Sequence, residues 1–291
     1  MSRLTLFHVG FLFLILFFTT TAKAQKEAET FNVDSTLYEY YQRCQECLLE
    51  PVVLNMSDTL FRMAGERQDE RMQAVAIATQ LDYYYFQGTN EDSVIHYTNK
   101  VKEFAKATHQ PKYYYFAWAN RLVTYYLKTS RTNIALYEVQ NMLKEAQKED
   151  DKTGLSRCYN IMSQIYTIKR FDSMAFEWRL KEIELTEKYN IENYNISQTY
   201  AQIANYYISQ KKQKEALRAV EKAISTANSS TQQISAKLEY VNYYSKFGDF
   251  QAAEKILKEC QIAFEQDKRL ESIKKRLYNI ECLYYQQTRQ Y

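Results

Sequence analysis

The sequence predicts an all-α solenoid of stacked antiparallel helix pairs. An aromatic-rich helix end, a short polar break and a small residue that opens a second helix recur along the 291-residue chain. The breaks centre on Gly88, Ser130, Arg170, Lys211 and Gly248, and a fixed period near 40 residues is typical of stacked helical units. Only 5 glycines and 2 prolines are present, which also favours a nearly all-helical chain.

The N-terminus has the composition of a secretory signal peptide. Arg3 supplies a positive charge, residues 4–18 form an apolar run, and Ala22-Lys23-Ala24 matches the small-x-small pattern that precedes signal cleavage. We therefore expect a signal peptide over residues 1–24, cleavage before Gln25 and an exported, periplasmic protein. An uncleaved N-terminal anchor is the alternative, although the run is short for a membrane span.

The remaining chain divides into helix pairs in order. Residues 25–69 are predicted to hold a polar lead-in and a diverged first pair, with Asp34 as the N-cap of a helix through about Leu49 and a partner over 52–67. The repeats proper then span residues 70–291. Their predicted pairs are 70–107, 112–148, 154–189, 193–228 and 231–266, followed by a last helix from about Leu270, which is either a cap or half of an incomplete repeat.

The pair at 193–228 carries a family resemblance. Large and small residues alternate along its two helices at Tyr200, Ile203, Ala204, Tyr207, Ala216, Val220 and Ala223. In this register the chain resembles the tetratricopeptide repeat family. The resemblance implies a right-handed solenoid in which the first helices line a concave groove for a protein or peptide. A HEAT-like repeat is the structural alternative, because its period is also near 40 residues.

Charge and motifs argue against several classes of function. Removing Arg3 and Lys23 leaves 36 of the 38 basic residues against 35 acidic ones, a net charge of +1, so no excess of positive charge favours nucleic acid. A membrane contact would need the uncleaved signal or a span downstream of this sequence. After the signal only His96 and His109 remain. No nucleophile, phosphate-loop or metal motif accompanies them, so we expect no enzyme, cofactor or metal.

Cysteine usage is also uninformative about chemistry. Cys44 and Cys47 form a C-x-x-C pair within a helical pattern and without a second pair nearby. We interpret them as structural thiols, with a local disulfide or a metal as alternatives.

The tetratricopeptide register implies a set of groove-facing positions on the first helices. They are Asn120, Thr124, Lys128, Arg157, Asn160, Gln164, Gln198, Asn205, Asn242 and Lys246. The amides among them would form a ladder, because a carboxamide both donates and accepts hydrogen bonds, as a peptide backbone requires. The cations Lys128, Arg157 and Lys246 would meet a carboxylate. The alternative is a merely solvated polar face.

Exported tetratricopeptide arrays rich in tyrosine pairs are similar to the periplasmic sensor halves of Bacteroidetes signal-transduction proteins. That resemblance implies a sensor role with an output segment downstream. A stand-alone periplasmic adaptor and an enzyme on a helical scaffold are the other two hypotheses.

Four short Asp-Ser or Asp-Thr motifs begin at Asp34, Asp58, Asp92 and Asp172. Helix capping explains them, because Asp and Ser are favoured at helix starts. They also resemble the O-glycosylation signal of exported Bacteroidetes proteins.

Overall fold

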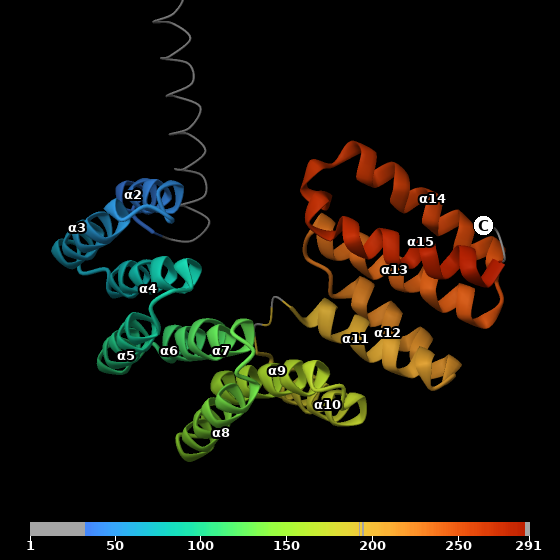
Figure 1. Cartoon of the computed structure of the whole chain (residues 1–291), viewed down its shortest axis with the longest axis horizontal. Coiled ribbons are helices and arrows are strands. Elements are labelled where there is room, and N and C mark those ends of the chain that lie inside the picture. The colour runs from blue at the N-terminus through green and yellow to red at the C-terminus, as the bar shows by residue number, and fades with distance from the viewer. Residues whose placement is uncertain (1–32, 192, 194, 289–291) are drawn as a thin grey trace, which may run out of the picture. The chain divides into compact units, whose positions relative to one another are not determined.

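The computed structural model describes residues 33–288 except 192 and 194, and every regular element within them is helical (Figure 1). This confirms the all-α prediction. The predicted signal peptide and residues 289–291, to which the last helix was predicted to extend, lie outside the described residues. The chain divides into two compact units, Met1–Glu149 and Asp150–Tyr291.

The first unit contains three first-helix/second-helix pairs. Its elements are α2 (Ser35–Glu46), α3 (Val52–Glu66), α4 (Glu70–Gln87), α5 (Glu91–Ala107), α6 (Pro111–Ala117), the π-helical turn η1 (Trp118–Val123), α7 (Thr124–Lys128) and α8 (Thr132–Lys148). The elements α6, η1 and α7 form one continuous helix over 111–128, the first helix of the third pair. Consecutive helices pack against each other, and the first helices α2, α4 and α6 also pack side by side.

The second unit contains three more pairs and a final helix. Its elements are α9 (Lys152–Ile168), α10 (Asp172–Tyr189), α11 (Ile196–Ser209), α12 (Gln213–Ser225), α13 (Ser230–Phe247), α14 (Phe250–Gln266), the 3₁₀ segment η2 (Lys268–Ile273) and α15 (Lys274–Thr288). The last helix was expected to start near Leu270. Instead that residue lies in the 3₁₀ segment, which Asp267 caps by accepting a hydrogen bond from the Arg269 N–H at 3.0 Å.

All five polar breaks that define the sequence period adopt the left-handed backbone conformation. The φ angles are 71° at Gly88, 60° at Ser130, 62° at Arg170, 57° at Lys211 and 89° at Gly248. A residue in this conformation ends a helix and lets the chain reverse into the antiparallel partner. The recurring break in the sequence is therefore the recurring turn of the fold.

The small residues on the two sides of the break at Lys211 pack as the helix-pair prediction requires. Ala204 on α11 and Ala216 on α12 are both fully buried, in one core with Tyr200 and Val220. Because neither alanine has a side chain beyond Cβ, the two helices approach closely, and the larger residues fill the space beside them.

The capping interpretation of the Asp motifs is right at only one of the four. Asp34 accepts a hydrogen bond from the Leu37 N–H at 3.0 Å and caps α2. Asp58 lies inside α3. Asp92 lies in the first turn of α5, which is capped by Asn90 instead. Asp172 is the first residue of α10, whose N-cap Phe171 makes no side-chain cap bond.

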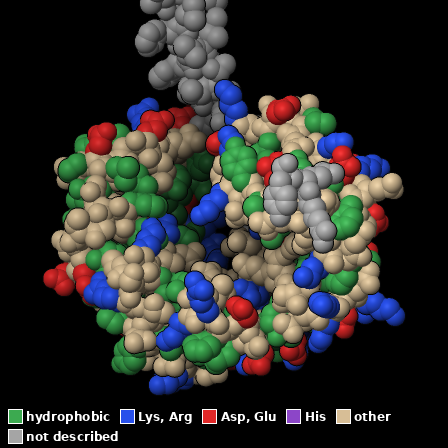
Figure 2. All heavy atoms as spheres, turned by 45° about the vertical axis from the view of Figure 1, so that its right-hand side comes forward, with side chains coloured by type: hydrophobic (Ala, Val, Ile, Leu, Met, Phe, Trp, Pro, Cys, Tyr) green, Lys and Arg blue, Asp and Glu red, His purple; other side chains and the backbone are tan. Residues whose placement is uncertain are grey.

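Two surface properties bear on the excluded classes. In Figure 2, Lys and Arg side chains lie among Asp and Glu side chains over the face displayed. Among the helices described, none combines the length and the hydropathy needed to cross a membrane. Cys44 and Cys47 are free cysteines, and Cys44 is buried.

Candidate ligand-binding groove

Two adjoining cavities lie between α9, α10 and α11 of the second unit, and we call them together the α9–α11 groove. The larger, of about 670 Å³, is lined by Thr167, Arg170, Phe171, Asp172, Ser173, Met174, Arg179, Gln202, Asn205, Tyr206, Ser209 and Gln210. The smaller, of about 370 Å³, is lined by Asn160, Gln164, Thr167, Ile168, Arg179, Asn195, Gln198, Thr199 and Gln202. Both volumes fall in the range of ligand sites in proteins, about 300–1,000 Å³.

The groove exists because the successive first helices α9 and α11 do not pack closely against each other. The first helices α11, α13 and α15 pack against one another in sequence, whereas α9 is joined to α11 mainly through α10, which packs against both. The link from α10 to α11 covers residues 190–195 and begins with Asn190 in the left-handed conformation, at φ 49°. The next such link, from α12 to α13, is shorter and covers only residues 226–229.

Arg179 of α10 lies at the floor of the groove, where both cavities meet. Its side chain ties the three helices together: Nε donates to Gln202 Oε1 of α11 and Nη2 donates to Thr167 Oγ1 of α9, each at 2.7 Å. Only 8% of Arg179 is exposed. Burial lowers the pKa of its guanidinium, and the more distant Glu182 and Asp172 act in the opposite direction. An arginine nevertheless stays protonated at neutral pH.

Glu182, one turn further along α10, connects the helices that line the groove. Its carboxylate is 1% exposed. It accepts hydrogen bonds from Asn160 Nδ2 at 3.1 and 3.2 Å, from Asn193 Nδ2 at 2.9 Å and from Thr199 Oγ1 at 3.4 Å. Desolvation raises the pKa of Glu182, and these hydrogen bonds oppose the rise. The carboxylate thus holds α9, α11 and the α10–α11 link in place.

The structure brings four of the predicted site residues to the groove. Asn160, Gln164, Gln198 and Asn205 line it. Arg157 lies beside the groove in a small cavity that it shares with Asn160 and Glu182.

The predicted ladder of amides is replaced by two separate pairs. Gln164 Nε2 donates to Asn160 Oδ1 along α9, and Asn242 Nδ2 of α13 donates to Asn205 Oδ1 of α11, both at 2.7 Å. Lys246, one turn beyond Asn242, is exposed and lines neither cavity.

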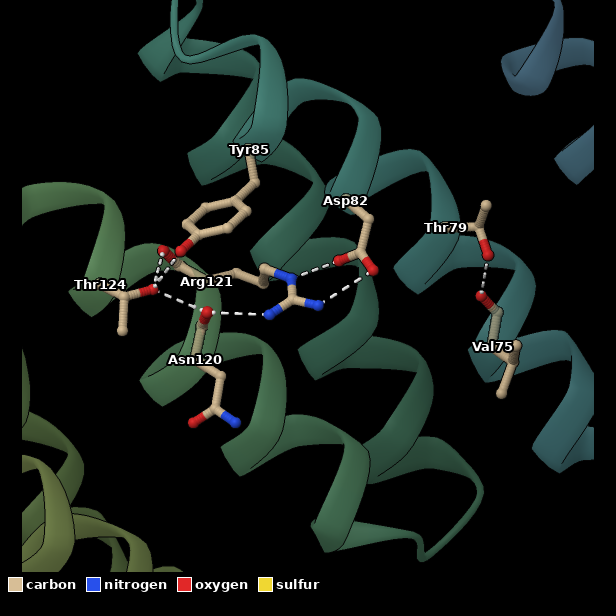
Figure 3. A network of polar contacts seen from close by, with 7 residues as sticks. All are labelled: Val75, Thr79, Asp82, Tyr85, Asn120, Arg121 and Thr124. Carbon is tan, nitrogen blue, oxygen red and sulfur yellow. Dashed lines mark hydrogen bonds and ion pairs between the residues drawn. The ribbon is translucent and has the colours of Figure 1, made fainter. Parts of the chain in front are cut away.

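Two of the predicted residues of the first unit, Asn120 and Thr124, lie in a different network, shown in Figure 3. Arg121 forms a bidentate ion pair with Asp82 of α4, and its Nη2 lies 3.0 Å from Asp82 Oδ2. Thr124 Oγ1 donates to the hydroxyl of Tyr85 at 3.2 Å. Lys128 Nζ lies 3.8 Å from the centroid of the Tyr85 ring.

Asn120, which was predicted to face the groove, takes part in this network through its backbone carbonyl. Its carbonyl accepts from Arg121 Nη1 at 3.0 Å and from Thr124 Oγ1 at 2.7 Å, while its carboxamide points away from Asp82 (Figure 3). Both Asn120 and Arg121 lie within the π-helical turn η1.

Sequence reasoning missed Arg179, Glu182 and Gln202, because it considered only hydrogen-bonding positions that the family register places on the concave face. A signal for two of them was present. Along α10, Arg179 and Glu182 follow Ala175 at the spacing of a buried helical stripe, where charged residues are rare unless they are paired or functional.

No protein-family model and no curated protein matches the sequence. Among solved structures, the chain is similar to the crystal structure of a Rap protein complexed with competence and sporulation factor. The TM-score is 0.50 at 14% sequence identity, with 87% of this chain and 77% of that chain covered. This likeness supports the tetratricopeptide-like helical-repeat fold.

Proposed function

We propose that this protein is a non-catalytic binding module that holds an extended peptide or protein segment in the α9–α11 groove. The observation that carries the proposal is the groove itself. Five of the residues that line its smaller cavity are amides, contributed by α9, by α11 and by the link before α11. Amides on two sides can pair with both the N–H and the C=O groups of a bound backbone. The similar Rap protein was crystallised with a bound partner, which supports a binding role for an array of this kind.

The amides that remain free are best placed for this role. Gln198 lines the smaller cavity, is exposed and makes no hydrogen bond with any described residue. Gln164, on the facing helix, is also exposed, and Asn160 is its only hydrogen-bond partner among the described residues. By contrast, Asn160 is engaged with Glu182, so its replacement would disturb the packing as well as any binding.

The test is a binding screen against an array of random decapeptides with free C-termini. Wild-type protein is expected to retain a subset of the peptides. The double variant Gln164→Ala with Gln198→Ala should bind them about 10–30-fold more weakly, because each lost hydrogen bond contributes about 1 kcal/mol. The control is Gln251→Ala, an exposed glutamine on the second helix α14. Absence of any retained peptide, or equal binding by the double variant, would contradict the proposal.

We also propose that the module is exported and acts as the periplasmic sensor part of a signal-transduction protein, with a stand-alone periplasmic adaptor as the alternative. The apolar run and Ala22-Lys23-Ala24 support export. Cell fractionation with N-terminal sequencing tests it: a periplasmic chain that begins at Gln25 is expected, and a cytoplasmic chain that begins at Met1 would contradict it. Sequencing the gene past Tyr291 distinguishes sensor from adaptor.

A further inference from the structure

The floor of the α9–α11 groove contains hydrogen-bond donors that the protein leaves unused. A guanidinium carries five N–H donors. Arg179 donates one hydrogen bond from Nε to Gln202 and one from Nη2 to Thr167. Its Nη1 makes no hydrogen bond with any described residue. At 8% exposure, these remaining donors have little access to bulk water except through the cavities that Arg179 lines.

No carboxylate contacts the positive charge of Arg179 directly, and Glu182 and Asp172 act on it only at longer range. Arg179 forms no ion pair with the described residues, and the partners of its hydrogen bonds are neutral. The carboxylate of Glu182 is engaged by Asn160, Asn193 and Thr199. The lining of the larger cavity also includes the exposed Arg170 and Asp172, one charge of each sign. Within the smaller cavity, Arg179 is the only charged residue in the described lining.

A buried charge without a partner is costly, and a carboxylate that is bound with good geometry offsets the cost. Arginine matches a carboxylate particularly well, because its planar donors can form two parallel hydrogen bonds to the two oxygens. Gln202 adds to this fit. Its Oε1 accepts from Arg179, which leaves its Nε2 directed to neither Arg179 nor any other described residue and able to donate to the same anion.

We propose that Arg179 and Gln202 form an anion subsite that selects peptides bearing a carboxylate, which docks at the floor of the α9–α11 groove. The inference rests on the proposed peptide-binding function and names the chemistry that the ligand must carry. The carboxylate comes either from an Asp or Glu side chain or from the C-terminus of the peptide. Because Arg179 belongs to the second helix of its pair, the subsite lies below the amides that face the groove from α9 and α11.

The experiment uses the tightest-binding decapeptide from the array, labelled with a fluorophore. It is compared with versions in which each Asp or Glu is replaced by Asn or Gln, and with a version amidated at its C-terminus. Affinities for wild-type protein, Arg179→Gln and Arg218→Gln are measured by fluorescence polarisation. Arg218 is a matched control, because it is an exposed arginine on α12 that lines neither cavity. Circular dichroism and melting temperature establish whether each variant is folded.

We expect one carboxylate of the peptide to be essential. Its neutralisation should weaken binding to wild-type protein about 10–100-fold, as should Arg179→Gln, since a hydrogen bond to a charged group contributes about 1.5–3 kcal/mol. Arg218→Gln should change nothing. Once the peptide is neutralised, Arg179→Gln should have little further effect, which places the two groups in contact. Loss by amidation identifies the C-terminus, and loss by a Glu→Gln or Asp→Asn change identifies a side chain.

Different results would contradict the peptide-binding function and the anion subsite. If wild-type protein retains no peptide at all, the proposed function fails and the subsite with it. If peptides bind but every neutralised version binds as well as its parent, the subsite alone is wrong. That comparison needs only wild-type protein, so it decides the question even if Arg179→Gln does not fold.

Discussion

The ion pair between Asp82 and Arg121 should contribute more to stability than an ordinary surface pair. It joins α4 to the π-helical turn η1 in the first unit, and each of its side chains is only 16% exposed. The perturbation is a double-mutant cycle with Asp82→Asn and Arg121→Gln, which removes each charge and keeps most of the shape. The cycle separates the pair from the contacts of Arg121 with the rings of Tyr85 and Phe116, at 5.0 and 4.8 Å.

The expected magnitude follows from the geometry. Exposed ion pairs contribute about 0.2–1 kcal/mol, whereas removing one partner of a fully buried pair costs about 3–5 kcal/mol. The Asp82–Arg121 pair lies between these limits, and its bidentate geometry supplies two charge-assisted hydrogen bonds. We therefore expect a coupling free energy of about 2–3 kcal/mol, and a somewhat larger loss of unfolding free energy for Asp82→Asn alone, because Arg121 would keep an unpaired charge.

Urea denaturation followed by circular dichroism measures the four free energies of unfolding in the cycle. The exposed pair Lys237–Glu259 provides a matched control, because its atoms are 3.1 Å apart and its side chains are 42% and 45% exposed. Its coupling should stay below about 1 kcal/mol. A coupling for Asp82–Arg121 that is no larger than that of the control would refute the reasoning from burial and bidentate geometry.

Three further predictions concern Glu182, a turn and the thiols. Because burial raises the folded-state pKa of Glu182 above 4.5, its stabilising contribution is complete below about pH 4.5 and is lost as pH rises through the higher folded value. Wild-type stability relative to Glu182→Gln should therefore fall with rising pH, and a constant difference between the two proteins would contradict this. Gly248→Ala should lower the free energy of unfolding in urea by about 1–2 kcal/mol. The cost comes from the backbone, because Gly248 has φ 89° and an added Cβ would meet no atom within 4 Å. An unchanged urea midpoint would show that the turn adopts another backbone conformation. Burial raises the pKa of Cys44 to about 11. A thiol reagent should therefore modify the exposed Cys282 first and Cys44 only on unfolding. Equal rates of modification would mean that Cys44 is accessible in the folded protein.

The sequence by itself determined the architecture of this protein. A helix pair must reverse the chain at one place and bring two helices close together at another. Both needs act on local residues: the breaks at Ser130 and Lys211 adopt the left-handed conformation without being glycine, and Ala204 and Ala216 permit the close approach. Such local requirements repeat with each pair, so they appear as a period in the sequence.

Only the tertiary structure decided which residues form the candidate site. Within the π-helical turn η1, the side chain that forms an ion pair with α4 is that of Arg121, a residue outside the predicted set. The groove depends on the separation of α9 and α11 beside Arg179. That separation results from the way in which α9, α10 and α11 pack together. Hydrogen-bond partners such as Asn160 of α9 and Glu182 of α10 come from different helices. Their pairing is a property of the folded arrangement, because hydrogen-bond energies depend on distances in space and not on separation along the chain.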